Sequence, residues 1–152
     1  MLVRGVSHVA IGVRDMDAAL PFYLDVLGLR VDFDDIEEFG DGKERPKTRR
    51  RAVYLHHTDD PASAFLVLDQ QLTRELSGGA AELFQVGIHH FGLWVDDVDA
   101  IVERGIKAGF PPLRPPSNAD TIAYGEPPGG VIRTVFFKDP EGNVVQCDQR
   151  VL

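Results

Sequence analysis

The sequence lacks the residues and segments on which several classes of protein depend. Its 152 residues include one cysteine, so neither an internal disulfide nor a cysteine-cluster metal site can form within the chain. No apolar run approaches the roughly 20 residues that span a bilayer, and the N-terminus lacks the pattern of a signal peptide. Basic residues are outnumbered, with 16 Lys and Arg against 24 Asp and Glu, and the resulting charge of −8 repels nucleic acid and anionic membranes. We therefore expect a cytoplasmic protein that binds neither.

The sequence also has no Gly-rich phosphate loop, nucleophile elbow or dinucleotide fingerprint. Hydrophobic residues make up 43% and charged residues 26%, values typical of a folded globular protein. The length allows one domain, or two half-size units that share a core. Because the net charge is negative and these motifs are missing, the expected ligand is a small neutral molecule or one steered by local charge.

The chain repeats itself. Residues 6–18 and 88–100 match with an offset of 82 residues, which aligns His8 with His90. After each histidine the apolar residues alternate, as in a half-buried strand. The other face of each strand carries the histidine beside small residues, which leaves room for a cavity. The alternating apolar residues are Val9, Ile11 and Val13 in the first copy, and Phe91, Leu93 and Val95 in the second.

Each repeated strand is followed by a predicted helix that begins at an aspartate, Asp15 or Asp97. Pro21 should kink the first helix or displace its start, and Gly28 should end it. Further strands are predicted over residues 52–56, 64–70, 131–137 and 144–149. The final strands of the two halves align with an offset of 79 residues, which makes Val67 the counterpart of Gln146. Each half is thus predicted as a strand, a helix and about three strands.

Two stretches fall outside the repeat. Residues 32–51 contain an acidic run followed by a basic one, and we interpret them as a solvated hairpin or loop instead of a nucleic-acid site. Residues 111–130 are rich in Pro and Gly. A loop of this length is a candidate rim for a binding site, with a plain surface connection as the alternative.

The two modules resemble the vicinal oxygen chelate superfamily of glyoxalases, bleomycin resistance proteins and extradiol dioxygenases. This resemblance implies an α+β fold in which two βαβββ modules pair into a curved mixed sheet, a cup around a central cavity. It further implies one domain over residues 1–152, with modules at about 4–72 and 86–150, and a homodimer. The matching segments are residues 7–17, 22–29, 89–97 and 138–143.

The resemblance also implies a metal site. Ligands in the superfamily come from the first and last strands of each module, and by position these are His8, Val67, His90 and Gln146. Val67 has no ligand atom and Gln146 stands where a glutamate is usual, so His8, His90 and Gln146 are the predicted metal ligands. An imidazole pair suits divalent Fe, Mn, Zn, Ni or Co. Alternatively, the two histidines hydrogen-bond a ligand or water without a metal.

Other residues are candidates for catalysis or for the substrate pocket. Tyr54 and His56 are candidates for acid–base chemistry, with surface hairpin residues as the alternative. Tyr124 and Glu126, in the Pro/Gly loop, are placed to close over a substrate. Trp94 would form a cavity wall, with core packing as its alternative. The predicted catalytic residues are therefore His56, Tyr54 and Tyr124, and the predicted pocket residues are Val67, Trp94, Asp148 and Glu126.

The leading functional hypothesis is a metal-dependent enzyme acting on a small oxygenated molecule, aromatic or enolisable, whose vicinal oxygens chelate the ion. The sequence around His90 favours the extradiol dioxygenase branch. A glyoxalase- or epimerase-type lyase or isomerase is one alternative. The other is a metal-free small-molecule binding or resistance protein of the same fold.

Overall fold

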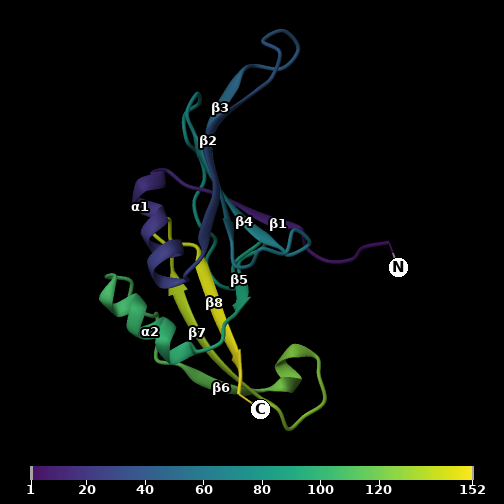
Figure 1. Ribbon diagram of the computed structural model, residues 1–152, viewed down its shortest axis with the longest axis vertical. Helices are drawn as coiled ribbons and strands as arrows, with labels where there is room; N and C mark the ends of the chain where they lie inside the picture. Colours follow the sequence, from purple (N-terminus) through teal and green to yellow (C-terminus); the bar gives the residue numbers. More distant parts are fainter. Residues whose placement is uncertain (1, 152) are drawn as a thin grey trace. The chain divides into compact units, whose positions relative to one another are not determined.

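The computed structural model, drawn in Figure 1, describes residues 2–151. These residues fall into two compact units divided between Gly78 and Gly79. Each unit contains one four-stranded sheet. No helix within the described residues is long and apolar enough to cross a bilayer. The first unit comprises β1 (His8–Gly12), α1 (Met16–Pro21), the π-helical turn η1 (Phe22–Val26), β2 (Arg30–Phe39), β3 (Thr48–His56) and β4 (Phe65–Gln71). The second comprises β5 (Phe91–Trp94), α2 (Val98–Lys107), β6 (Ser117–Asp120), the 3-10 turn η2 (Thr121–Tyr124), β7 (Val131–Lys138) and β8 (Val144–Arg150).

Both units have the same topology. The strand order is β1-β4-β3-β2 in the first sheet and β5-β8-β7-β6 in the second. In each sheet the first strand runs parallel to the last, and the other neighbours are antiparallel. The predicted α+β fold of two βαβββ modules is therefore confirmed.

Strand pairing confirms the internal alignment as well. Ala10 pairs with Val67 in the first sheet, and Gly92 pairs with Gln146 in the second. Because these two pairs occupy the same place in the repeat, Val67 and Gln146 are structural counterparts, as the offset of 79 residues predicts.

Each sheet has one face covered by its own helix, here called the helix-covered face. In the first sheet the alternation places Ile11 on this face, where it is buried, and turns His8 and Gly12 to the other. The side that carries His8 or His90 is here called the histidine face. Burial of apolar side chains on the helix-covered face is the main stabilising contribution in each unit. The buried side chains of this face are Ile11, Val53, Leu55, Leu66 and Leu68 in the first sheet, and Val135, Phe137, Val145 and Cys147 in the second.

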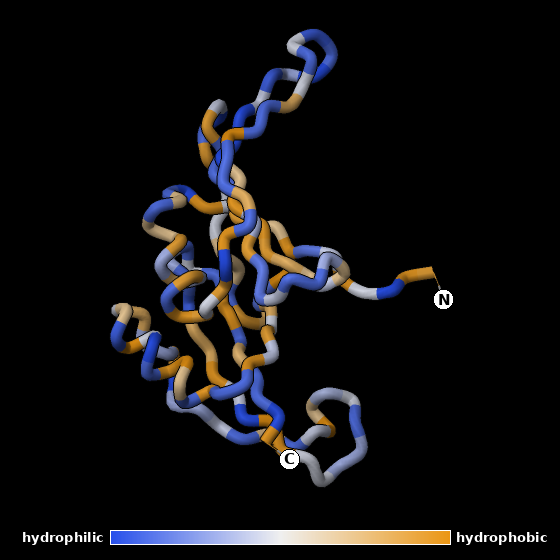
Figure 2. The backbone as a smooth tube through the Cα atoms, viewed as in Figure 1, coloured by the Kyte–Doolittle hydropathy of each residue, from blue (hydrophilic) through white to orange (hydrophobic). Residues whose placement is uncertain are grey.

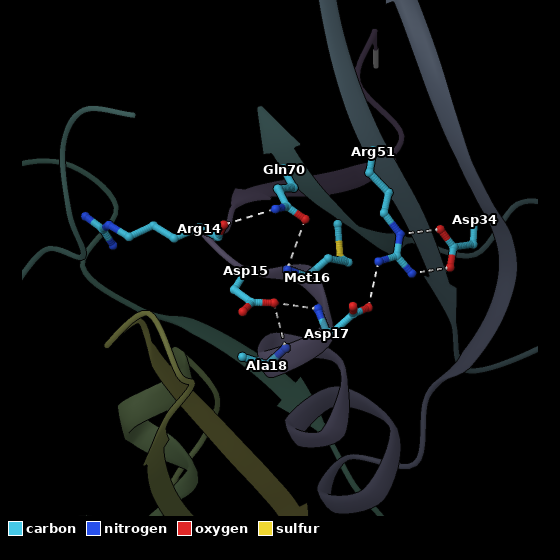
Figure 3. A network of polar contacts seen from close by, with 8 residues as sticks. All are labelled: Arg14, Asp15, Met16, Asp17, Ala18, Asp34, Arg51 and Gln70. Carbon is cyan, nitrogen blue, oxygen red and sulfur yellow. Dashed lines mark hydrogen bonds and ion pairs between the residues drawn. The ribbon is translucent and has the colours of Figure 1, made fainter. Parts of the chain in front are cut away.

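The helices begin where the aspartates predict. The Asp15 carboxylate accepts hydrogen bonds from the backbone N–H groups of Asp17 and Ala18 (Figure 3), and the Asp97 carboxylate accepts one from Ala100. Pro21 ends the regular part of the first helix, which continues as the π-helical turn η1. Proline has no backbone N–H to donate to a helical hydrogen bond, and the irregular turn after Pro21 is the kind of disturbance expected from it.

A glutamine anchors each helix to its sheet. The backbone N–H of Met16 donates to Gln70 Oε1 at 3.2 Å (Figure 3), and that of Val98 donates to Gln149 Oε1 at 3.0 Å. Both glutamines lie on the last strand of their module, so the contact is repeated between the units.

An ion pair between sheet and helix is repeated too. Arg51 contacts Asp17 at 2.7 Å in the first unit, as seen in Figure 3, and Arg133 contacts Asp99 at 2.7 Å in the second. Arg51 also pairs with Asp34 of β2 at 2.8 Å. The helix-covered sides of the two units therefore share polar contacts as well as apolar packing.

The stretch from residue 32 to 51 forms an ordered hairpin of β2 and β3. The sequence predicted a solvated hairpin or loop here, without the bounds of β2. Cross-strand ion pairs hold it, including Lys47 with Glu38 at 3.3 Å. Its far end projects from the sheet in Figure 1 and is largely hydrophilic in Figure 2. Lys47, Arg50 and Arg51 thus each have an acidic partner within the hairpin. The second unit has the short strand β6 at this place.

Candidate functional site

Aromatic rings line the histidine face of the first sheet. The Phe65 ring lies in the middle of this group, stacked on His56 with ring centroids 4.7 Å apart and on His8 at 5.3 Å. Tyr54 lies 5.7 Å from Phe65, and Phe33 extends the row at 4.8 Å from Tyr54. The structure therefore brings the predicted residues His8, Tyr54 and His56 together around Phe65.

A charged network adjoins this aromatic row. The Arg50 guanidinium contacts Glu37 and Asp69, each at 2.7 Å. Burial raises the pKa of Asp69 above its ordinary value, and Arg50 opposes that shift. The Tyr54 hydroxyl lies 3.5 Å from Glu37 Oε1, at the outer limit of a hydrogen bond. Each charge in this network has an opposite charge beside it.

The histidine face of the second sheet carries another aromatic pair. The rings of Trp94 and Tyr124 lie 5.5 Å apart, and the Arg150 guanidinium lies 4.6 Å from the centre of the Trp94 ring. Arg150 also binds Glu126, with one N–O distance of 2.9 Å, and this hydrogen bond lowers the pKa of Glu126. The predicted pocket residues Trp94 and Glu126 thus both contact Arg150.

Two further polar side chains, Gln146 and Asp148, lie beside the Tyr124 hydroxyl of this pair. The Gln146 amide group donates to the Asp148 carboxylate at 2.9 Å and to the Tyr124 hydroxyl oxygen at 3.1 Å. Burial, followed by the hydrogen bond to Asp148, raises the pKa of Tyr124 to about 12. The Tyr124 hydroxyl is therefore protonated at neutral pH, where it serves as a hydrogen-bond donor and not as a base.

The two repeated histidines each contact the residue that precedes them. His8 Nδ1 lies 3.1 Å from Ser7 Oγ, and His90 Nδ1 lies 2.8 Å from His89 Nδ1. In both, Nε2 is the ring nitrogen not engaged in that contact. His90 also lies against Phe136, with ring centroids 6.4 Å apart.

The residues at the four ligand positions do not fit a centre of two histidines and a carboxylate. Val67 is buried and has no donor atom. The Gln146 amide is engaged with Asp148 and Tyr124, and it carries no negative charge to balance a divalent ion. Within residues 2–151, no group of three or more His, Cys, Asp or Glu side chains is arranged to hold a metal. The assignment of His8, His90 and Gln146 as ligands stays a prediction.

Several residues of these faces were not predicted from the sequence. Phe65, Arg50 and Glu37 complete the first face, while Arg150 and Arg114 complete the second, where Arg114 lies 4.8 Å from the centre of the Phe136 ring. Alternation from Val67 would have found Phe65, and alternation from Gln146 would have found Arg150. The partners of Arg50 lie on neighbouring strands, so they depend on the strand register, which could not be predicted from the sequence.

Cys147 lies on the helix-covered face and is fully buried. Burial raises the pKa of its thiol to about 12. Since the thiolate is the reactive form, Cys147 serves as a small apolar side chain.

Comparison with known proteins identifies the family. Residues 5–147 match the model of the glyoxalase/bleomycin resistance protein/dioxygenase superfamily, whereas no curated protein sequence matches the chain significantly. A glyoxalase family protein from Bacillus cereus aligns over 100% of this chain and 97% of its own, at 18% identity and a TM-score of 0.76. A superfamily domain from Frankia sp. EAN1pec aligns over 97% and 98%, at 22% identity and a TM-score of 0.65. TnmS3, described as an antibiotic binding protein from Streptomyces sp. CB03234, aligns over 99% and 98%, at 23% identity and a TM-score of 0.60. With its repeated βαβββ modules and a family match over nearly its whole length, the chain belongs to the glyoxalase/bleomycin resistance protein/dioxygenase superfamily.

Proposed function

We propose that the protein binds a small, flat aromatic molecule without a metal ion. The observation that carries this proposal is the platform formed by Trp94 and Tyr124, whose rings lie 5.5 Å apart on the histidine face of the second sheet. Trp94 is 56% exposed, so part of its indole ring is open to a ligand beside the Arg150 guanidinium, which lies 4.6 Å from the ring centre. Aromatic side chains that present a ring and a polar tip are well suited to hold a planar ligand.

The polar groups beside the platform would orient such a ligand. Tyr124 keeps its proton at neutral pH because its pKa is raised to about 12, and its hydroxyl donates that proton to the Asp148 carboxylate, so the hydroxyl oxygen is left as an acceptor for a ligand donor. Gln146 offers an amide oxygen as a further acceptor. These neutral groups favour recognition by hydrogen bonding over bond-breaking chemistry.

One structural relative points to the same class of activity. TnmS3 is described as an antibiotic binding protein. That description applies to TnmS3. For the present chain it suggests, together with the Trp94–Tyr124 platform, that an antibiotic with a flat aromatic part is a ligand to test.

Calorimetric titration with naphthol and coumarin tests the proposal. We expect at least one of them to bind with the same affinity with and without EDTA. Trp94→Ala should weaken binding about tenfold, since one aromatic stacking contact contributes about 1–3 kcal/mol. Phe84→Ala is the matched control, because Phe84 is an aromatic residue with 89% exposure outside both sheets. Binding that requires a divalent ion, or that survives loss of Trp94, would contradict the proposal.

A metal-dependent enzyme of the dioxygenase, lyase or isomerase type is the second candidate function. It is favoured by the equivalent positions of His8 and His90, each of which uses Nδ1 toward the preceding residue. Metal analysis of protein purified without chelator separates the two candidates. An enzyme of this kind predicts stoichiometric metal in the wild type and its loss in a His8→Ala, His90→Ala double variant.

A further inference from the structure

The two modules place an aspartate at the same position but neutralise only one of the two. Asp69 pairs with Gly12 across the first sheet, and Asp148 pairs with Trp94 at the equivalent place in the second. The Arg50 guanidinium lies 2.7 Å from Asp69. Within residues 2–151, by contrast, no ion pair joins Asp148 to a lysine, arginine or histidine.

Asp148 is also the more deeply placed of the two carboxylates, with 5% of its surface exposed. Its hydrogen-bond partners are the Gln146 amide and the Tyr124 hydroxyl. Both are neutral, so they satisfy the oxygen atoms but leave the negative charge in place. A buried carboxylate without a counter-charge is costly, and a cation brought beside it recovers part of that cost.

The surroundings of Asp148 suit a cation. Trp94 and Tyr124 present aromatic faces, which attract positive charge. The Trp94 indole already accepts the Arg150 guanidinium, which is bound to Glu126 and not to Asp148. Gly92 lies beside the carboxylate, and a Cβ atom there would stand 3.5 Å from Asp148 Oδ2, so the glycine leaves this space open.

From these observations we infer that the second sheet holds a position for the cationic group of the ligand, formed by the Asp148 carboxylate with the rings of Trp94 and Tyr124. The ligand class is a small aromatic molecule that carries an amidinium, guanidinium or ammonium group. This inference rests on the proposed binding function and adds a charge requirement to it. The negative net charge of −8 favours the approach of such a ligand.

Three benzene derivatives of similar size and shape test the inference: benzamidinium, neutral benzamide and anionic benzoate. We expect the wild type to bind benzamidinium at least tenfold more tightly than benzamide, with benzoate weakest. Raising the salt concentration should weaken benzamidinium binding and leave benzamide unchanged. This comparison needs no variant, so it does not depend on the folding of a mutant protein.

Asp148→Asn should abolish the preference for benzamidinium while keeping the shape of the side chain. Asp69→Asn is the matched control from the other module and should retain the preference, with folding of both variants checked by circular dichroism. Equal affinity for benzamidinium and benzamide in the wild type, or a preference that survives Asp148→Asn, would overturn the inference. If naphthol or coumarin still binds in that case, the proposed function stands. If no aromatic compound binds, both fail.

Discussion

The helix-covered faces of the two sheets are alike, whereas their histidine faces differ. On the helix-covered side, Arg51 and Arg133 make the same ion pair with a helix aspartate in each unit. On the other side, Val67 and Gln146 occupy equivalent positions, and so do Tyr54 and Phe136. The repeat has therefore kept the contacts that hold each helix on its sheet, and it has varied the face that is available for a ligand.

The placement of one arginine illustrates this divergence. In the first sheet Arg50 of β3 pairs with Gln71 of β4, whereas in the second Ile132 of β7 pairs with Arg150 of β8 at the equivalent place. The arginine therefore lies on β3 in the first sheet and on β8 in the second. From β3 it reaches Asp69, but from β8 it reaches Trp94 and Glu126.

The largest expected effect comes from substitutions that create a cavity on the helix-covered face of each sheet, and they test whether the two faces are equivalent. Leu55 and Phe137 are counterparts in the repeat, with exposures of 1% and 0%. We expect Leu55→Ala to lower the free energy of unfolding by about 2–5 kcal/mol and Phe137→Ala by about 3–5 kcal/mol, measured by urea denaturation. Phe136→Ala, on the half-buried histidine face, is the control and should cost less. A loss of under about 1 kcal/mol at either buried site would show that the two faces are not equivalent.

Removal of the cation from the first face tests the difference. Arg50→Met leaves Asp69 unpaired and should destabilise the protein by about 1–3 kcal/mol at neutral pH. The pKa of Asp69, already raised by burial, should rise further, so stability is lost as pH rises through that pKa and regained as pH falls. Urea denaturation across the acidic range measures this. Arg150→Met should cost less than Arg50→Met, because the ion pair of Arg150 with Glu126 is exposed. Equal costs would erase the distinction between the two faces.

The helix caps offer a smaller comparison. Asp15→Ala and Asp97→Ala should each lower the free energy of unfolding by about 1 kcal/mol. We expect the greater effect at Asp15, whose carboxylate accepts from two backbone N–H groups while that of Asp97 accepts from one. Thermal denaturation of the alanine and asparagine variants provides the measurement. Since asparagine also caps helices, the asparagine variants should stay close to the wild type.

Ionisation of Tyr124 should have the smallest effect, because it leaves stability near neutral pH unchanged. The pKa of Tyr124 is raised to about 12, so its favourable contribution is present below about pH 10 and is lost as pH rises through the folded-state value. Asp148→Asn should bring this pKa part of the way back toward the ordinary value. Alkaline absorbance titration, with Tyr124→Phe to identify the signal, measures it. No change in Asp148→Asn would mean that burial alone sets the shift.

Much of the fold could be predicted because it depends on local patterns. Alternation predicted the strands after His8 and His90, and Asp15 and Asp97 marked the helix starts, since a cap needs only a side chain and the next turn. The strand β2 was harder, because its acidic residues show no apolar alternation. Its β structure depends on cross-strand partners such as Arg50 and Arg51 of β3.

The sequence by itself determined the repeat, the order of a strand, a helix and further strands in each half, and the counterpart relation between Val67 and Gln146. These follow from spacing along the chain, which strand and helix periods translate directly into structure. Only the tertiary structure decided which carboxylate is neutralised. Strand register places Arg50 beside Asp69 and directs Arg150 toward Glu126, leaving Asp148 with neutral partners. Charge balance at a site depends on neighbours across strands, and spacing along one strand does not specify them.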